Sequence, residues 1–99
     1  MSFEEHVQRA LDDLPADLAR ALQNVVVVVE DEDPDDPGLF GLWEADEFLP
    51  DKITIFRKPL TAAFADPREL EHEIRTTVLH ELAHYFGIDE DRLDELGYA

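Results

Sequence analysis

The chain has 99 residues, of which 25 are acidic and 8 are Lys or Arg, so its formal net charge is −17. This length suits one domain, residues 1–99, with one modest hydrophobic core. The charge argues against binding to nucleic acid or to anionic membrane surfaces, because both depend on Lys and Arg meeting phosphates. The chain contains no cysteine, which excludes disulfides and thiolate metal sites.

The N-terminal sequence is acidic and lacks the apolar stretch of a signal peptide. The longest aliphatic run, Val25–Val29, is too short to cross a bilayer. We therefore expect a cytoplasmic protein without membrane partners. The negative charge permits a basic peptide or a basic protein as partner, although its ordinary effect is solubility.

Two helices are predicted before the first strand. Ser2 and Glu5 form a capping-box pattern, and apolar residues then recur at helical spacing as far as Leu14. Pro15 can open a second helix at its first turn. We expect both helices to pack on the sheet, because a chain of this length has few other apolar faces.

Three strands are predicted in the middle of the chain. Val25–Val29 consists of β-branched residues, typical of a strand covered on both faces, so we predict that it is the central strand. Residues 39–43 form a short apolar strand in which Gly41 indicates a bulge. Residues 52–57 alternate between two faces until a proline stops the strand. The acidic segment 30–38 lacks the Gly and the bidentate Glu of a calcium loop, which favours a solvated loop.

A long helix is predicted to run as far as residue 86. Asp66 is its expected N-cap, and Pro67 takes the first helical position. An apolar stripe recurs along it with a period of 3.6 residues: Leu70, Ile74, Val78 and Leu82. Gly87 can end the helix in the left-handed conformation. A short last helix is expected after Asp89.

The long helix carries the motif His-Glu-x-x-His at residues 80–84. Residues four apart differ by about 40° around a helix, so His80 and His84 project from one face and can reach one metal ion. Glu81 lies about 100° further round, the position of a general base beside a metal-activated water. Two surface histidines on an amphipathic helix are the alternative interpretation. His72 lies two turns before His80 on a different face, so we expect it to be exposed.

The motif and its surroundings resemble the minimal zincins, small bacterial zincin-like metallopeptidases of one domain. The residues that carry this resemblance are 39–44, 52–60, 80–88, 92–93 and 95–98, so it covers essentially the whole chain. It implies an α+β, zincin-like fold: N-terminal helices, a small mixed sheet of about three strands, a long metal-binding helix with HExxH, and a short C-terminal helix. It also makes the strand at 52–57 the candidate edge that binds an extended peptide.

The third metal ligand is expected just after the glycine that ends the long helix. In metzincin-like geometry it lies six residues after His84, which is Glu90, although the family usually has Asp there. Asp89 is the alternative ligand, but it is also the natural N-cap of the last helix. Tyr98 and Arg57 are candidates for substrate or transition-state support. The alternatives are a packed aromatic for Tyr98 and a salt bridge for Arg57.

These residues predict a zinc metallopeptidase with one zinc ion per chain and a peptide or protein substrate. Zinc would polarise the scissile carbonyl, and Glu81 would activate the attacking water and later protonate the leaving amine. The alternative is a catalytically weak or inactive zincin-fold module that binds metal or protein, because 99 residues leave little room for a deep cleft. A third hypothesis, an acidic interaction protein, depends on charge alone.

Overall fold

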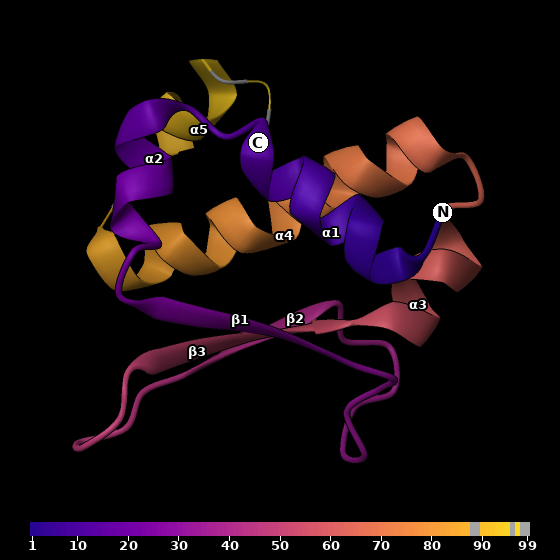
Figure 1. The fold of residues 1–99 in the computed structure, drawn as a ribbon, viewed down its shortest axis with the longest axis horizontal. Coiled ribbons are helices and arrows are strands. Elements are labelled where there is room, and N and C mark those ends of the chain that lie inside the picture. Colours follow the sequence, from indigo (N-terminus) through magenta and orange to yellow (C-terminus); the bar gives the residue numbers. More distant parts are fainter. Residues whose placement is uncertain (88–89, 96, 98–99) are drawn as a thin grey trace.

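The computed structural model describes residues 1–87, 90–95 and 97, without the side chains of residues 84–86 and 90. Within these residues the chain forms an α+β fold of five helices and one three-stranded sheet (Figure 1). In chain order the elements are α1 (Phe3–Asp12), α2 (Ala16–Ala21), β1 (Val25–Glu30), β2 (Gly41–Glu44), β3 (Asp51–Phe56), α3 (Arg57–Ala63), α4 (Pro67–Phe86) and α5 (Glu90–Glu95). The predicted α+β arrangement is confirmed: N-terminal helices, a three-stranded mixed sheet, a long helix and a short C-terminal helix.

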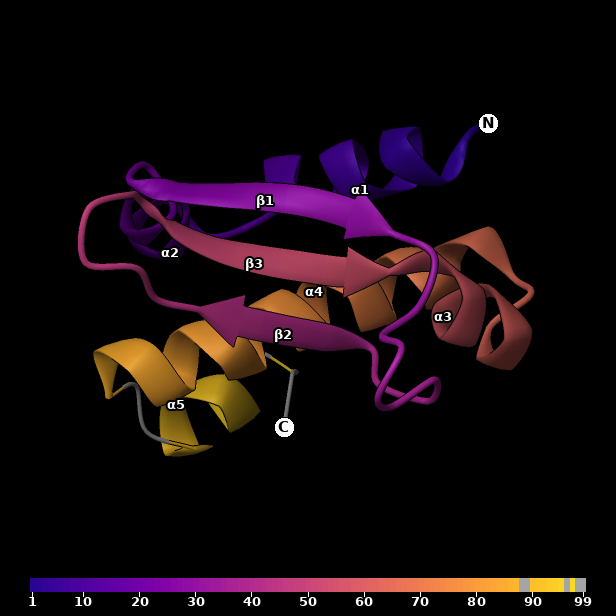
Figure 2. The same cartoon turned by 90° about the horizontal axis from the view of Figure 1, so that it is seen from below.

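The sheet has the order β1-β3-β2, with β1 parallel and β2 antiparallel to β3 (Figure 2). The prediction that Val25–Val29 forms the central strand is therefore wrong, as is the prediction that residues 52–57 form an edge. The helices cover only one face of the sheet (Figure 1), so the valines of β1 are covered incompletely and Val26 is 46% exposed. β3 lies between two neighbours, which buries Ile53, Thr54 and Ile55 almost completely.

The core lies between the sheet and the helices α1 and α4. All four residues of the apolar stripe predicted for the long helix are buried: Leu70, Ile74, Val78 and Leu82. They pack with Ile53 and Ile55 of β3 and with Phe3, Val7 and Ala10 of α1. This stripe fixes the rotation of α4, and with it the direction in which the motif at residues 80–84 faces.

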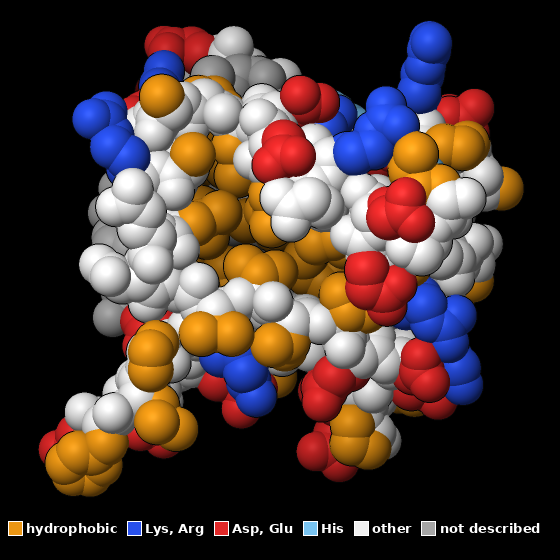
Figure 3. All heavy atoms as spheres, viewed as in Figure 1, with side chains coloured by type: hydrophobic (Ala, Val, Ile, Leu, Met, Phe, Trp, Pro, Cys, Tyr) orange, Lys and Arg blue, Asp and Glu red, His pale blue; other side chains and the backbone are white. Residues whose placement is uncertain are grey.

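The edge strand β1 borders an apolar hollow on the face that Figure 3 presents. The hollow has a volume of about 410 Å³ and lies between β1 and α1. Three valines line it from the strand, and two apolar and two polar residues line it from the helix: Val27, Val28 and Val29, then Val7, Leu11, Glu4 and Gln8. The outer edge of the sheet on this side thus combines an apolar strand with incomplete helical cover.

A partly buried polar cluster joins α1 to α4. His6 Nδ1 donates to Glu71 Oε2 at 2.6 Å, and Arg9 Nε lies 3.7 Å from Glu71 Oε1. The hydrogen bond from His6, with the charges of Arg9 and Arg75 nearby, holds the pKa of the Glu71 carboxyl below its ordinary value although burial opposes this. The cluster anchors the N-terminal half of α4 to α1.

α3 begins directly at the end of β3 and was not predicted from the sequence. Pro59 lies in its first turn, where a missing N–H removes no helical hydrogen bond. The acidic loop after β1 meets the same point: Lys58 N donates to Asp31 O at 2.9 Å, and Phe56 N donates to Phe40 O at 2.9 Å. Both ends of this loop are therefore fixed at the junction of β3 and α3.

None of the described helices is long and apolar enough to cross a membrane.

Candidate active site

The helix α4 presents the motif on one regular element of 20 residues. Its start follows from the sequence: Asp66 is the N-cap, and its carboxylate accepts from Arg68 N and Glu69 N, which confirms the predicted cap. Its end follows as well, because Gly87 adopts the left-handed conformation with φ of 66°. The motif residues at 80–84 thus occupy the last two turns before a glycine-driven change of direction.

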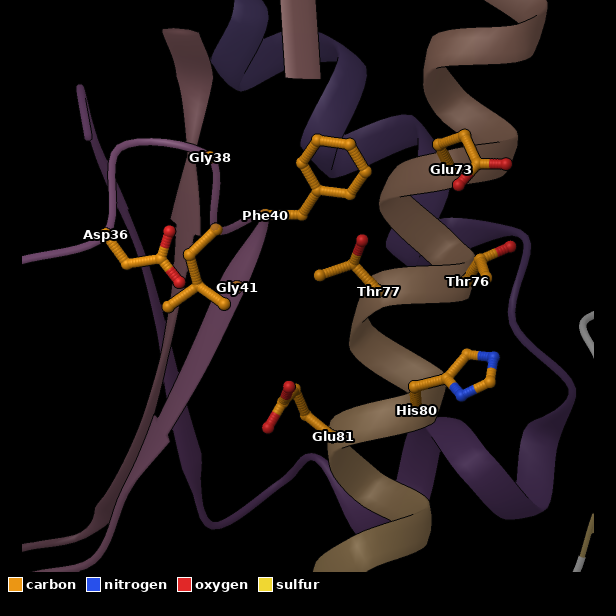
Figure 4. A pocket seen from close by; sticks show the side chains of 10 residues that line it. Asp36, Gly38, Phe40, Gly41, Glu73, Thr76, Thr77, His80 and Glu81 are labelled. Atoms are coloured by element: carbon orange, nitrogen blue, oxygen red, sulfur yellow. The ribbon is translucent and has the colours of Figure 1, made fainter. Parts of the chain in front are cut away.

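His80 and Glu81 are half-buried and line a cleft of about 490 Å³ between α4 and residues 36–41 (Figure 4). The side chain of Glu81 points from the helix toward the sheet, whereas the ring of His80 points away from the sheet. The two neighbouring residues thus leave the helix in different directions, as their separation of about 100° around it requires. Both residues border the same cleft.

The two remaining predicted ligands are described through their backbones alone. His84 lies in the last turn of α4, and Glu90 is the first residue of α5. Asp89 and Tyr98 lie outside the described residues. Among the described side chains no group of three or more His, Cys, Asp or Glu is placed to hold a metal ion. The ligand set therefore stays a prediction.

The backbone arrangement fits a zinc site of this composition. One unbroken helix holds His80 and His84 one turn apart, as the shared coordination of a metal ion requires. α5 lies near the C-terminal end of α4 (Figures 1 and 2). It is fixed by Leu93, which is 2% exposed, and by Arg92 Nη2, which donates to Asp17 Oδ2 of α2 at 2.8 Å. Imidazole nitrogen and carboxylate oxygen are ordinary zinc ligands.

Arg57, a candidate for substrate support, lies at the start of α3 and pairs with Asp31. Its Nη2 donates to Asp31 Oδ1 at 2.6 Å, and this contact holds the pKa of the Asp31 carboxyl below its ordinary value. This contact is the salt bridge that was expected as the alternative role of Arg57. A role of Arg57 toward substrate stays a prediction. His72 is exposed on α4, as expected.

The close approach of β2 to α4 was not foreseen from the sequence. Gly41 pairs regularly with Ile55, so the predicted bulge is wrong. A Cβ atom on Gly41 would lie 2.5 Å from Thr77 Cγ2 and 3.3 Å from Thr54 O, closer than packed atoms allow. The glycine therefore lets the strand lie against the helix one turn before the motif. A glycine inside a strand was the available signal, but it does not specify which backbone or side chain comes near.

The comparisons with known proteins agree with this geometry. The sequence model of the family described as zincin-like metallopeptidase matches residues 22–98, almost the whole chain. The chain belongs to this family, which confirms the resemblance found in its sequence. The comparison with curated protein sequences finds no match.

Proposed function

We propose that this protein is a zinc-dependent peptidase whose active site is the cleft beside α4. The observation that carries the proposal is that His80 and Glu81 of the motif both line one cavity, which β2 and the preceding loop border. Family membership supports the same class of reaction. The proposal extends it to zinc as the metal and to Glu81 as the general base.

The proposed ligands of one zinc ion are His80, His84 and Glu90. When bound there, zinc would supply Lewis acidity toward the scissile carbonyl and a lowered pKa for the attacking water. The chain's own contribution is proton transfer: Glu81 takes a proton from the attacking water and delivers it to the leaving amine. This role is supported by the place of Glu81 in the lining of the same cleft as His80, with its side chain toward the sheet.

The strand β2 replaces residues 52–57 as the candidate platform for substrate. Within the described sheet β2 pairs with β3 alone, so its other side is an edge that borders the cleft. An extended peptide can add to such an edge through main-chain hydrogen bonds. This arrangement would hold the scissile bond alongside α4, within reach of Glu81.

The test is the substitution Glu81→Gln in the full, zinc-loaded chain. We expect unchanged zinc content and a loss of peptide hydrolysis of about a hundredfold or more, because the amide keeps the shape but cannot accept the proton. Hydrolysis is measured on a mixture of unstructured peptides by mass spectrometry, and zinc content by elemental analysis. Glu47→Gln, an exposed loop position, is the matched control and should cleave like the wild type.

The proposed role of Glu81 fails if the Gln variant cleaves as fast as the wild type. If the wild type binds zinc and cleaves no peptide, the alternative of a metal-binding module without turnover holds instead.

A further inference from the structure

We propose that the cleft selects peptides that carry Lys or Arg near the scissile bond, through Asp36 on one wall and Glu73 on the other. The inference depends on the proposed function in one respect, that a peptide occupies the cleft. Asp36 lies on the loop across from α4, and Glu73 lies on α4 two turns before His80 (Figure 4). The cavity beside the motif defines the site, and its lining defines the class of side chain that fits.

The first argument concerns charge. Six of the eight Lys and Arg residues pair with carboxylates elsewhere: Arg9 with Glu71, Lys52 with Glu44, Arg57 with Asp31, Lys58 with Glu32, Arg75 with Asp13, and Arg92 with Asp17. Asp36 and Glu73 take part in no ion pair within the described part of the chain. No Lys or Arg is among the described residues that line the cleft. Within the described residues, the charges of Asp36 and Glu73 are therefore not compensated by an ion pair.

One candidate for compensation is Arg68, which lies on α4 five positions before Glu73 and borders a neighbouring hollow together with it. The two nevertheless form no ion pair of 4 Å or less. The carboxylate of Glu73 thus remains available to a cation that enters along the helix.

The second argument concerns the apolar part of the lining. Leu39 and Phe40, in the loop just before β2, also line the cleft. The ring of Phe40 is held edge to face against Phe64, with ring centroids 5.9 Å apart, and it points toward α4 (Figure 4). Lys and Arg join an alkyl stem to a cation, so one side chain can pack on an aromatic ring while its charge meets a carboxylate. An acidic side chain at the same place would be repelled.

The experiment measures binding, which does not depend on turnover. The zinc-loaded full chain with Glu81→Gln is titrated with capped six-residue alanine peptides in which one Arg is placed at each position in turn. The matched ligand has neutral citrulline, of nearly the same shape, at the same position. We expect at least one position where Arg binds up to about fivefold tighter than citrulline, because an ion pair at a partly exposed site contributes up to about 1 kcal/mol. Asp36→Asn or Glu73→Gln should reduce this ratio toward one, whereas Glu47→Gln should not.

Equal affinity for Arg and citrulline at every position overturns the inference, and so does the absence of any binding. A preference that survives both Asp36→Asn and Glu73→Gln overturns it as well. Peptide hydrolysis by the wild type decides the proposed function separately. Cleavage without preference for basic residues would support the peptidase function and contradict the proposed subsite. Arg-selective binding without cleavage would support the subsite and contradict the peptidase function.

Discussion

Glu90 is the proposed ligand whose role depends most on local backbone geometry. Gly87 turns the chain at the end of α4, and α5 begins at Glu90, six residues after His84. Glu is one methylene longer than Asp, so it can reach further from the same backbone position. The first turn of α5 is therefore where the third ligand is expected.

Zinc titration tests this assignment. His84→Ala and Glu90→Ala should each weaken zinc binding by about a hundredfold or more, because even outer-shell partners of ligands are worth about 10–100-fold. Asp89→Ala should bind nearly as tightly as the wild type, and His72→Ala is the control on the same helix. If Asp89→Ala loses zinc affinity and Glu90→Ala does not, the third ligand is Asp89 and not Glu90.

Glu71 makes the stability of the protein depend on pH in the acid range. Its pKa is lowered in the folded state, so its contribution is complete above the ordinary carboxyl pKa and is lost as the pH falls through the lowered value. Glu71→Gln should reduce the free energy of unfolding by about 1–2 kcal/mol at pH 7, because a charged hydrogen bond becomes a neutral one. Urea unfolding at several pH values should show this difference shrinking toward pH 3. A difference that does not vary with pH would contradict the prediction, and Glu47→Gln is the control.

At this scale the sequence reveals the motif but not the walls of the cleft. The pattern at 80–84 is local, because one helical turn brings its histidines together. Asp36 and Phe40 come to line the same cleft as Glu73 only when β2 packs on α4. In a chain of net charge −17, the sequence of an acidic loop does not indicate which carboxylate borders a cavity. Such positions follow from tertiary contacts.

At the scale of elements, the contact of Gly41 with Thr77 sets how closely β2 lies against α4. Gly41→Ala should destabilise the protein by about 1–3 kcal/mol in urea unfolding, because the new methyl has no space. Gly38→Ala is the matched control: its Cβ would have nothing nearer than Asp36 Oδ1 at 3.8 Å, so it should be nearly neutral. Thr77→Ser removes the Cγ2 atom and should recover most of the loss in the double variant. Additive effects of the two changes would contradict this contact.

The elements that the sequence predicts well are those with local signals. The capping box of Ser2 and Glu5 and the cap of Asp66 begin α1 and α4 as predicted. The prediction of which strand is central was wrong, because a run of valines suits any partly buried strand and does not specify its neighbours. α3 was missed because it has only seven residues and no side-chain N-cap.

For the molecule as a whole, the net charge of −17 is spread over a body of 33 × 30 × 21 Å. In 0.01 M salt the Debye length is about 30 Å, so nearly every carboxylate repels the others, whereas in 1 M salt it is about 3 Å. We expect the melting temperature to rise by several degrees over this range, since 1 kcal/mol corresponds to about 4–8 °C in a chain of this size.

The matched control for this salt dependence is a variant with three exposed acids neutralised: Asp35→Asn, Glu47→Gln and Asp94→Asn. Its charge of −14, three less negative than −17, should reduce the rise. A melting temperature that falls with salt would mean that attraction within the ion pairs outweighs repulsion.

The parallel pairing of β1 with β3 has a consequence for the newly made chain. Each residue of β1 pairs with one 26 positions later, Val25 with Asp51 and Glu30 with Phe56, so this strand leaves the ribosome well before its partner. An unpaired run of five valines is the kind of segment that seeds aggregates. Glu30 and the acidic residues up to Asp36 follow it directly and serve as gatekeepers during that delay. The loop that forms one wall of the cleft in the folded protein thus also protects the edge strand while the protein is being made.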